Sequence, residues 1–386
     1  MLSPISAILD KALADKALST DEGYQLIHCT EDELPALLSA ASVLRDRHKG
    51  RTVTYSRKVF LPVTNLCRDR CSYCTFRKDP RDPGAWTMSP EDIHDWLDRG
   101  RAQGCKEALM CLGDKPELAY SSYRKTLANF GHATTTEYVY RACEIALSLG
   151  VLPHTNAGIM TRAEMHYLKA VNVSLGLMLE NISPRLRQRG MAHFSAPDKD
   201  PAVRVRMIRE AGELEIPFTT GILIGIGETL EERVDSLTAI RDLHQAHGHI
   251  QEVIVQNFRA KPNTRMASAP EPESLDMAKT VAVARLLFGG AMNLQAPPNL
   301  SPDDHKLLLR SGINDWGGIS PVTQDYVNPE AAWPHLTTLA HTCREEGFTL
   351  RERLAIYPEY INRPGFLLPA LRPRTEKLQE QVMAYA

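Results

Sequence analysis

At residues 58–74 the chain reads KVFLPVTNLCRDRCSYC. The run begins with apolar and β-branched residues, which predict a short buried strand. Three cysteines follow at Cys67, Cys71 and Cys74, with the spacing C-x3-C-x2-C. Thiolates this close together on one loop can meet on one small face of the protein. The stretch therefore predicts a strand that leads directly into a loop of candidate metal ligands.

Downstream of this strand, similar apolar runs alternate with amphipathic stretches that are typical of helices. The expected strands cover residues 58–63, 107–112, 151–156, 171–178, 218–224, 252–257, 292–296 and, more weakly, 311–314. The expected helices begin at the cap Ser89 and then cover 135–149, 202–214, 229–244, 274–288 and 331–346. Such strand–helix alternation predicts an α/β fold, a (β/α)8 TIM-type barrel, with chemistry at the C-terminal ends of its parallel strands.

The rest of the chain is expected to add two segments to the barrel. Residues 1–50 read as a helical N-terminal extension, because caps and first-turn acids occur there without strand patterns. The barrel is expected over residues 51–365, and residues 366–386 are expected to form a C-terminal tail or helix.

Composition excludes several classes of protein. The chain has 386 residues, with 45 Lys and Arg against 47 Asp and Glu, which argues against a general nucleic-acid or membrane-surface binder. No apolar run is long enough to span a membrane, and residues 1–15 lack the features of a signal peptide. We therefore expect a cytoplasmic protein whose 8 cysteines are ligands, catalytic groups or core residues rather than disulfides.

The cysteine loop fits an iron–sulfur cluster better than a zinc site. Clusters usually have four cysteine ligands, so three would leave one iron open to an exogenous molecule. Structural zinc also takes four ligands and would need an additional histidine that the sequence does not identify. The remaining alternative is a loop whose three cysteines lie close together by chance and bind no metal.

The motif C-x3-C-x-aromatic-C after a first barrel strand resembles the radical S-adenosylmethionine superfamily. This resemblance implies that Cys67, Cys71 and Cys74 hold a [4Fe-4S] cluster whose open iron chelates S-adenosylmethionine. One electron from the cluster would then break a carbon–sulfur bond and yield a 5′-deoxyadenosyl radical that abstracts hydrogen from the substrate. The expected cofactors are the [4Fe-4S] cluster and S-adenosylmethionine.

The same resemblance implies residues that bind S-adenosylmethionine. Tyr73 falls where the superfamily has an aromatic residue against the adenine, and the backbone around Gly113 and Asp114 falls where it receives the methionine amino group. Glu180 and Arg204 match a pair that contacts the ribose and the methionine carboxylate in the branch with biotin synthase. Loop packing and an ordinary ion pair are the alternative explanations of these residues.

A further match lies on the fifth expected strand. The stretch at 221–228, GILIGIGE, matches the superfamily pattern G-x-I-x-G-x-x-E with Leu in place of Ile. In that family its glycines, here including Gly225, let the backbone approach the adenine.

Four segments narrow the resemblance to the first subunit, or N-terminal half, of the deazaflavin synthase family: residues 67–77, 216–221, 256–262 and 313–323. The resemblance implies a lyase of coenzyme F-420 biosynthesis. It would close the central ring of a tyrosine-derived hydroxybenzyl/ribityl-aminouracil adduct and release ammonia, 5′-deoxyadenosine and methionine. It also implies a partner, the tyrosine-transferring radical enzyme, and an electron donor such as ferredoxin or flavodoxin.

A polyol joined to a uracil and a phenol calls for neutral donors and acceptors. The candidate substrate residues at expected strand ends are His154, Asn156, Gln256, Asn257, Asn293 and Asn314. Asp315 is the candidate carboxylate for moving a proton as ammonia leaves. Each of the amides could equally be a cap or loop residue.

Two other functions stay open from the sequence. One is a different branch of the superfamily, either the tyrosine-transferring partner or a futalosine-pathway cyclase. Those branches usually have Phe where Tyr73 stands and lack the WGGISP run at 316–321 in this form. The other is a binding module without catalysis that carries a cluster or zinc.

Overall fold

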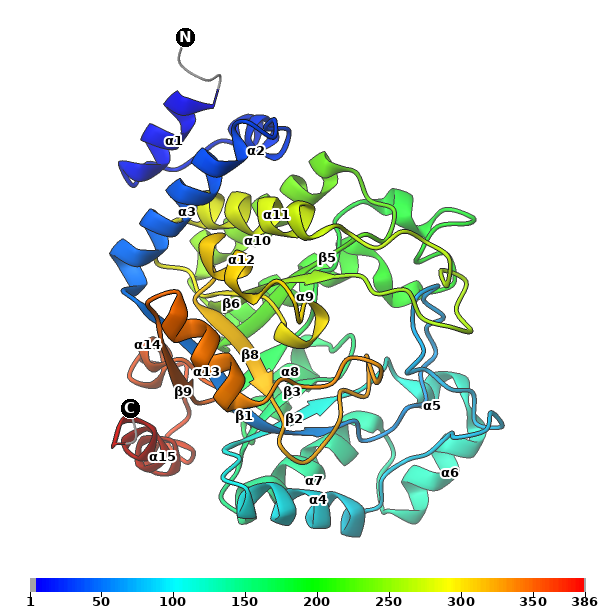
Figure 1. Cartoon of the computed structure of the whole chain (residues 1–386). Helices are drawn as coiled ribbons and strands as arrows, with labels where there is room; N and C mark the ends of the chain where they lie inside the picture. Colours follow the sequence, from blue (N-terminus) through cyan, green and yellow to red (C-terminus); the bar gives the residue numbers. More distant parts are fainter. Residues whose placement is uncertain (1–4, 385–386) are drawn as a thin grey trace.

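The computed structural model describes residues 5–384, and this part of the chain forms a closed barrel of parallel strands with helices around it (Figure 1). The barrel strands are β1 (Thr52–Leu61), β2 (Glu107–Cys111), β3 (Leu152–Asn156), β4 (Ser174–Gly176), β5 (Phe218–Ile224), β6 (Ile250–Asn257), β7 (Leu294–Gln295) and β8 (Asp315–Ile319). Each strand pairs with the next, and β1 closes the ring by pairing with both β2 and β8. The predicted (β/α)8 fold is confirmed. The first four and last two residues of the expected terminal segments lie outside the described residues.

The longest barrel strand, β1, joins three neighbours. Its second half, Lys58–Leu61, pairs with β2, and its first half, Thr52–Ser56, pairs with a further parallel strand, β9 (Thr349–Arg353). The other edge of β1 pairs with β8. Strand β9 therefore extends the wall of the barrel at its N-terminal end, below the start of β2.

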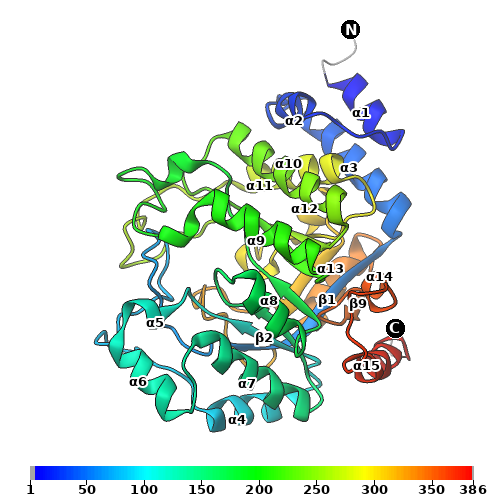
Figure 2. The same ribbon diagram turned by 180° about the vertical axis from the view of Figure 1, so that it is seen from behind.

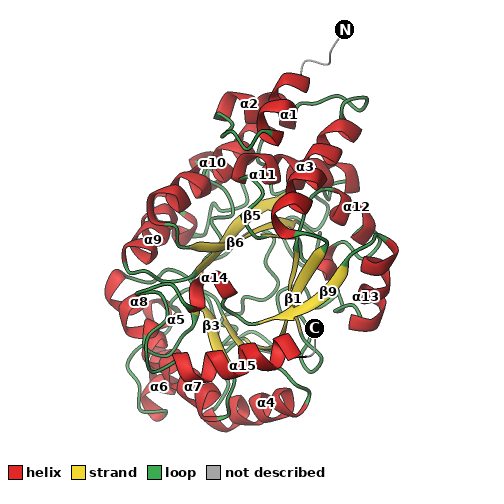
Figure 3. Cartoon of the chain, turned by 90° about the vertical axis from the view of Figure 1, so that its left-hand side faces the viewer, coloured by secondary structure: helices red, strands yellow, loops and turns green. Residues whose placement is uncertain are grey.

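Helices surround the strands on the outside of the barrel (Figures 2 and 3). They are α4 (Pro90–Ala102), α5 (Pro116–Ala119), α6 (Ser121–Asn129), α7 (Thr135–Ser148), α8 (Arg162–Lys169), α9 (Pro201–Glu213), α10 (Leu230–His247), α11 (Ser274–Phe288), α12 (His305–Arg310) and α13 (Leu336–Glu345). Short 3-10 turns are η1 (Pro184–Arg187), η2 (Pro197–Lys199) and η3 (Pro298–Leu300). The predicted start of α4 at Ser89 is confirmed, because Ser89 and Asp92 cap each other's backbone N–H groups.

Most predicted strands agree with the structure, and the fifth, residues 218–224, agrees at both ends. The eighth does not. Residues 311–314 lead out of α12, and the strand itself starts at Asp315. Its sequence, DWGGI, contains two adjacent glycines that obscure the strand pattern. Strand β9 reads TLRER, and a polar sequence of this kind gave no apolar run to detect.

Three N-terminal helices, α1 (Ser6–Leu13), α2 (Thr20–Ile27) and α3 (Leu34–Lys49), pack on one side of the barrel (Figure 1). Helix α3 is fixed there by Arg45, which is fully buried and donates hydrogen bonds to the carbonyls of Leu309 (2.9 Å) and Ile313 (2.6 Å). No helix in the described part of the chain is both long and apolar enough to cross a membrane.

At the C-terminal end of the chain, β9 is followed by α14 (Pro358–Ile361) and α15 (Arg372–Ala384). The segment after β9 runs across the N-terminal end of the barrel (Figure 3). The Ala355 carbonyl accepts a hydrogen bond from Ser174 on β4 (2.7 Å), and the Tyr357 N–H donates to Gln251 on β6 (3.2 Å). This segment therefore covers the end of the barrel that lies opposite the cysteine loop.

A charged network lies inside that covered end. The Arg353 guanidinium donates to both oxygens of Asp315 (2.6 and 2.9 Å) and to Glu252 (2.7 Å), and all three side chains are buried. Tyr357 Oη also donates to Glu252 (3.1 Å). Two carboxylates therefore share one guanidinium. Burial and the nearby Asp315 charge raise the pKa of Glu252 to about 7, although Arg353 opposes the shift.

This network predicts that the free energy of unfolding falls as pH rises toward 8. The pKa of Glu252 is about 7 in the folded chain, against an ordinary value of 4.5. Between pH 4.5 and 7 the folded chain therefore binds more protons than the unfolded chain does. The stabilisation that comes from the Glu252 proton is complete below about pH 4.5 and is lost as pH passes through about 7. Glu252→Gln should flatten this decline, measured as urea midpoints from pH 5.5 to 8. Glu346→Gln is the control, since Arg310 lowers the pKa of Glu346 and its removal should leave the slope unchanged in this range. A slope that Glu252→Gln leaves unchanged would refute the assignment.

Candidate active site

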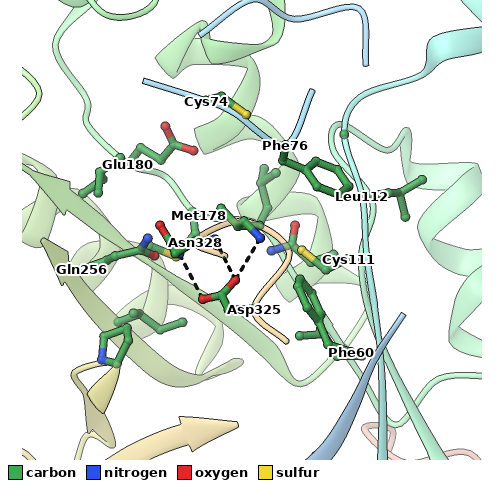
Figure 4. A pocket seen from close by; sticks show the side chains of 18 of the residues that line it. Phe60, Cys74, Phe76, Cys111, Leu112, Met178, Glu180, Gln256, Asp325 and Asn328 are labelled. Atoms are coloured by element: carbon green, nitrogen blue, oxygen red, sulfur yellow. Dashed lines mark hydrogen bonds between the residues drawn. The ribbon is translucent and has the colours of Figure 1, made fainter. Parts of the chain in front are cut away.

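The C-terminal ends of the barrel strands surround a cavity of about 320 Å³. Cys67, Cys71 and Cys74 all line it, so the cysteine loop after β1 forms part of its wall. Figure 4 shows Cys74 on one side of the cavity and Asp325 on the other. The volume is within the range of small-molecule sites, so the space between the cysteines and the floor of the barrel can hold a ligand.

The cysteine loop is held by backbone hydrogen bonds to the segment after β4. Arg70 N–H donates to the Ser195 carbonyl (2.9 Å), and Ser72 N–H donates to the Ala192 carbonyl (2.8 Å). On the other side, the Asp114 N–H donates to Cys67 Sγ (3.1 Å). A cysteine sulfur carries negative charge when it binds a metal, and a backbone N–H that donates to the sulfur stabilises this charge.

The three cysteines fit a [4Fe-4S] cluster. All are free thiols, and burial raises the pKa of Cys67 to about 12 and that of Cys71 well above its ordinary value. Thiolates at these positions therefore need a positive partner, which iron supplies. In the described residues no three or more His, Cys, Asp or Glu side chains are placed around a single metal ion. A cluster does not need that arrangement, because each thiolate binds a different iron.

Gly113 keeps Cys67 in place by lacking a side chain. A Cβ on Gly113 would lie 2.4 Å from Cys67 Cβ and 2.6 Å from its Sγ, closer than atoms can approach. Gly113→Ala should therefore displace Cys67 and lower iron per chain after anaerobic reconstitution by about tenfold, the lower end of the range for disturbed ligand support. Gly131→Ala is the control: its φ of 83° strains an alanine there, but nothing lies within 4 Å of the added Cβ, so this variant should retain full iron content. Normal iron content in Gly113→Ala would show that the contact is dispensable.

Beside the cysteines, Glu180 collects several polar partners. Tyr73 Oη donates to Glu180, Lys199 forms an ion pair with it, and His193 Nε2 lies 3.1 Å from its carboxylate. Burial alone would raise the pKa of Glu180, but Lys199, His193 and Arg204 hold it well below its ordinary value. The carboxylate is therefore ionised and fixed next to the cavity.

The backbone at Glu180 is strained. Its φ of 64° lies in the left-handed region, which a side chain with a Cβ rarely adopts. The position is held by a hydrogen bond from its N–H to the Gly221 carbonyl (2.9 Å) and one from the Leu223 N–H to its own carbonyl (3.0 Å). Strain of this kind is typical of functional positions, because the surrounding structure must hold it.

The other predicted S-adenosylmethionine residues differ in their placement. Arg204 lines the cavity, but its nearest approach to Glu180 is 3.9 Å, and it donates instead to the carbonyls of Met178 (2.6 and 2.8 Å) and Asp198 (3.1 Å). Asp114 also lines the cavity, and its carboxylate accepts from Arg68 (2.8 Å). Burial and a neighbouring Asp198 carboxyl raise the pKa of Asp114 to about 7.

Gly225 does not lie on the cavity wall. Its N–H donates to Glu228 (2.7 Å), its φ is 89°, and a Cβ there would lie 2.4 Å from Pro272 Cγ. Its position just after β5 is explained by this turn and by the packing against Pro272.

The structure brings only part of the predicted substrate group to the cavity. Asn156 and Gln256 line it, as the last and next-to-last residues of β3 and β6. Asn257 faces away and donates to the Leu300 carbonyl (3.1 Å), because neighbouring residues on a strand point to opposite sides. His154 lies deeper in the barrel against Ser174 (2.6 Å), and burial lowers its pKa to about 4.

Asn293, Asn314 and Asp315 lie at the opposite end of the barrel from the cysteines. Asn293 and Asn314 precede β7 and β8 and hydrogen-bond each other (3.1 Å), and Asp315 is the first residue of β8, where it pairs with Arg353. The sequence interpretation placed β8 too early and so assigned Asn314 and Asp315 to its C-terminal end. It placed Asn293 within the seventh strand, whereas β7 starts only at Leu294. Asp315 does not reach the cavity, and the geometry does not support its expected role in proton transfer.

Several cavity residues were not identified from the sequence. Lys58 and Phe60 lie on β1 and point inward by strand alternation, a signal that the sequence contains. Asp325, Asn328 and Trp333 come from the loop after β8, which has no regular pattern that would place it over the barrel. Asp325 accepts hydrogen bonds from Asn328 (Figure 4).

Comparison with known proteins assigns the family. The model of the radical SAM superfamily matches residues 61–240. The 7,8-didemethyl-8-hydroxy-5-deazariboflavin synthase of Methanopyrus kandleri is 47% identical over 312 residues, which cover 81% of this chain and 93% of that enzyme. The chain belongs to the deazaflavin synthase family. Membership of the radical SAM superfamily implies a [4Fe-4S] cluster and S-adenosylmethionine as cofactors.

The deazaflavin synthase family also includes longer proteins. The FO synthase of Mycobacterium tuberculosis is 48% identical over 376 residues, which cover 93% of this chain but only 44% of that protein. The chain thus spans less than half the length of this relative. The 7,8-didemethyl-8-hydroxy-5-deazariboflavin synthase of Methanothermobacter thermautotrophicus is 46% identical over 326 residues, which cover 84% of this chain and 98% of that enzyme.

Solved structures support the barrel fold of this chain. The hydrogenase maturase HydG superposes with a TM-score of 0.75 at 17% identity, covering 90% of this chain and 76% of that one. Methylornithine synthase superposes with a TM-score of 0.69 at 19% identity, covering 89% and 97% of the two chains. At this level of identity the likeness concerns the fold alone.

Proposed function

We propose that the chain closes the central ring of the deazaflavin chromophore in coenzyme F-420 biosynthesis. The substrate would be the tyrosine-derived hydroxybenzyl/ribityl-aminouracil adduct, and ammonia, 5′-deoxyadenosine and methionine would be released. The observation that carries the proposal is that the cysteine loop and two strand-end amides, Asn156 and Gln256, line one cavity. Similarity to the synthase of Methanopyrus kandleri over nearly its whole length supports the proposal.

The chain's own residues would bind and orient the two ligands. When bound, the cluster and S-adenosylmethionine supply one-electron cleavage that leads to hydrogen abstraction. Cys67, Cys71 and Cys74 would hold the cluster, and the fixed Glu180 carboxylate suits a ribose hydroxyl that donates to it. Tyr73 would pack against the adenine, and the backbone at Gly113 and Asp114 would receive the methionine amino group.

Arg204 would bind the methionine carboxylate only after turning from the Met178 and Asp198 carbonyls that it now contacts. Gly225 would act indirectly, by holding the turn after β5 that borders the adenine side. For the substrate, Asn156 and Gln256 would provide amide donors and acceptors to the ribityl hydroxyls or the uracil ring.

The chain would act with a second radical enzyme that transfers the tyrosine fragment. Support comes from the FO synthase of Mycobacterium tuberculosis, of which this chain matches 44%. The rest of that protein would then correspond to the partner. An electron donor such as ferredoxin or flavodoxin would reduce the cluster.

An anaerobic assay tests the proposal. The reconstituted chain, the tyrosine-transferring partner, tyrosine, S-adenosylmethionine and ribityl-diaminouracil should together give deazaflavin fluorescence. Neither enzyme alone should give it. Product from the partner alone would assign ring closure to the partner, and formation of a hydroxybenzyl adduct by this chain alone would assign it to the transferase branch. Absence of dithionite-dependent 5′-deoxyadenosine release would reduce the chain to a binding module.

A further inference from the structure

Lys58 is a buried cation without a charged partner. It lies on β1, lines the cavity and is 8% exposed. The other cationic side chains on the cavity wall have partners: Arg77 contacts Asp79, Lys199 contacts Glu180, and Arg204 contacts backbone carbonyls. Among the described residues, none forms a hydrogen bond or ion pair with the Lys58 ammonium. The ammonium is not enclosed by the protein but faces the cavity, so it can donate hydrogen bonds to a ligand there.

Two glycines on β8 leave the space that Lys58 and Gln295 occupy. A Cβ on Gly318 would lie 2.3 Å from Lys58 Cδ and 2.8 Å from its Nζ. A Cβ on Gly317 would lie 2.0 Å from Nε2 of Gln295, which also lines the cavity. The glycines in the run at 316–321 therefore make room for cavity side chains. They allow a long cationic side chain and an amide to lie across the floor of the cavity.

Aromatic rings border the Lys58 ammonium. Its Nζ lies 4.7 Å from the ring centroid of Trp333 and 5.4 Å from that of Phe60, within the range of cation–π interaction. The apolar residues Leu109 and Ile254 also line the cavity. One cation among rings and aliphatic groups suits a planar ligand with a single oxygen acceptor, since a phosphate calls for several donors.

An acceptor without a partner lies on the same cavity wall. Asn299 is buried, and its Nδ2 donates to Asp325 Oδ2 (2.9 Å) and to the Ala331 carbonyl (3.2 Å). Its Oδ1 has no hydrogen-bond partner within residues 5–384 and is closed to solvent, so a ligand in the cavity reaches it only when the wall opens slightly. Asp325 is itself fixed by the backbone N–H groups of Val327 (2.9 Å) and Asn328 (3.0 Å), so the direction of the Asn299 amide is set.

We infer that Lys58 anchors the substrate by donating to a carbonyl or enolate oxygen of a planar heterocycle, with Asn299 Oδ1 accepting an N–H or O–H of the same ligand. The inference rests on the proposed function for the identity of that heterocycle. A ring system with adjacent carbonyl and N–H groups, as in a uracil, offers both kinds of atom. Lys58 is thus a substrate-binding residue on the floor of the cavity, and the cysteines lie on its wall.

The test is direct binding of the product. Fluorescent 7,8-didemethyl-8-hydroxy-5-deazariboflavin is titrated anaerobically into the cluster-loaded enzyme and its variants. Lys58→Met keeps the length and removes the charge, and it should weaken the Kd by about 10- to 100-fold. Lys58→Arg keeps the charge and should recover part of the affinity. Lys125→Met, on the exposed face of α6, is the control and should bind as the wild type does.

Two further readouts separate binding from folding. Lys58→Met should unfold at nearly the same temperature as the wild type, because the ammonium faces the cavity and makes no hydrogen bond or ion pair on which the fold depends. Its iron content after anaerobic reconstitution should match that of the wild type. An unchanged Kd in Lys58→Met, a large loss of thermal stability, or no binding by the wild type would each overturn the inference. Failure of the proposed function looks different: the wild type would bind the deazaflavin through Lys58 yet form no product with the partner.

Discussion

Replacing Cys67, Cys71 and Cys74 together by alanine should remove the iron–sulfur cluster and abolish S-adenosylmethionine cleavage while the barrel stays folded. All three side chains line the cavity, and no disulfide or ion pair in the described structure depends on them. Each replacement should change the free energy of unfolding by about 1 kcal/mol or less. Because the cofactors carry the chemistry, turnover should fall on the order of a thousandfold or more. Iron analysis, visible absorption and 5′-deoxyadenosine release measure these effects.

A fourth cysteine in the same cavity provides a matched control. Cys111, at the end of β2, lines the cavity as the three loop cysteines do, and burial raises its pKa to about 12. It lies outside the C-x3-C-x2-C loop, so Cys111→Ala should retain iron and cleavage activity. If Cys111→Ala lost the cluster while one of the loop variants kept it, the assignment of the ligands would be wrong.

The fold could be predicted because strand and helix periodicities are local. Seven apolar runs marked β1 to β7 well enough to define the barrel, and the cap at Ser89 marked the start of α4. Strands β8 and β9 were misplaced or missed for a physical reason. Gly317 and Gly318 make space for Gln295 and Lys58, so β8 lacks the side chains that identify a strand.

The site could be predicted only where its residues are close together in sequence. The cysteine loop and Tyr73 lie within one short stretch, and the structure places all of them on the cavity wall. The substrate side depends on register instead. A shift of four residues in β8 moved Asp315 from one end of the barrel to the other. Lys199, which holds Glu180, comes from a 3-10 turn with no motif of its own.

Asp315 has a structural role that its sequence context did not show, and removing its partner should have the second large effect. Arg353→Met should destabilise the fold by about 3 to 5 kcal/mol, because Asp315 and Glu252 would stay buried without their shared cation. That is a large part of the 5 to 15 kcal/mol that is typical of a folded domain. The variant should unfold on the order of 10 °C lower or accumulate as insoluble protein, measured by thermal scanning and soluble yield.

Arg310→Met is the matched control, because Arg310 makes an ion pair of the same geometry at an exposed position. Arg310 forms the same two-pronged contact with Glu346 (2.8 and 2.7 Å), but its side chain is 64% exposed, so its loss should cost about 1 kcal/mol or less. Adding Asp315→Asn and Glu252→Gln to Arg353→Met should restore part of the lost stability, because neutral amides do not need the guanidinium. Such a rescue would show that Arg353→Met loses stability because the Asp315 and Glu252 carboxylates stay buried without a cation. If Arg353→Met cost no more than Arg310→Met, the charged network would contribute little, and the C-terminal segment would be held across the barrel by its backbone contacts alone.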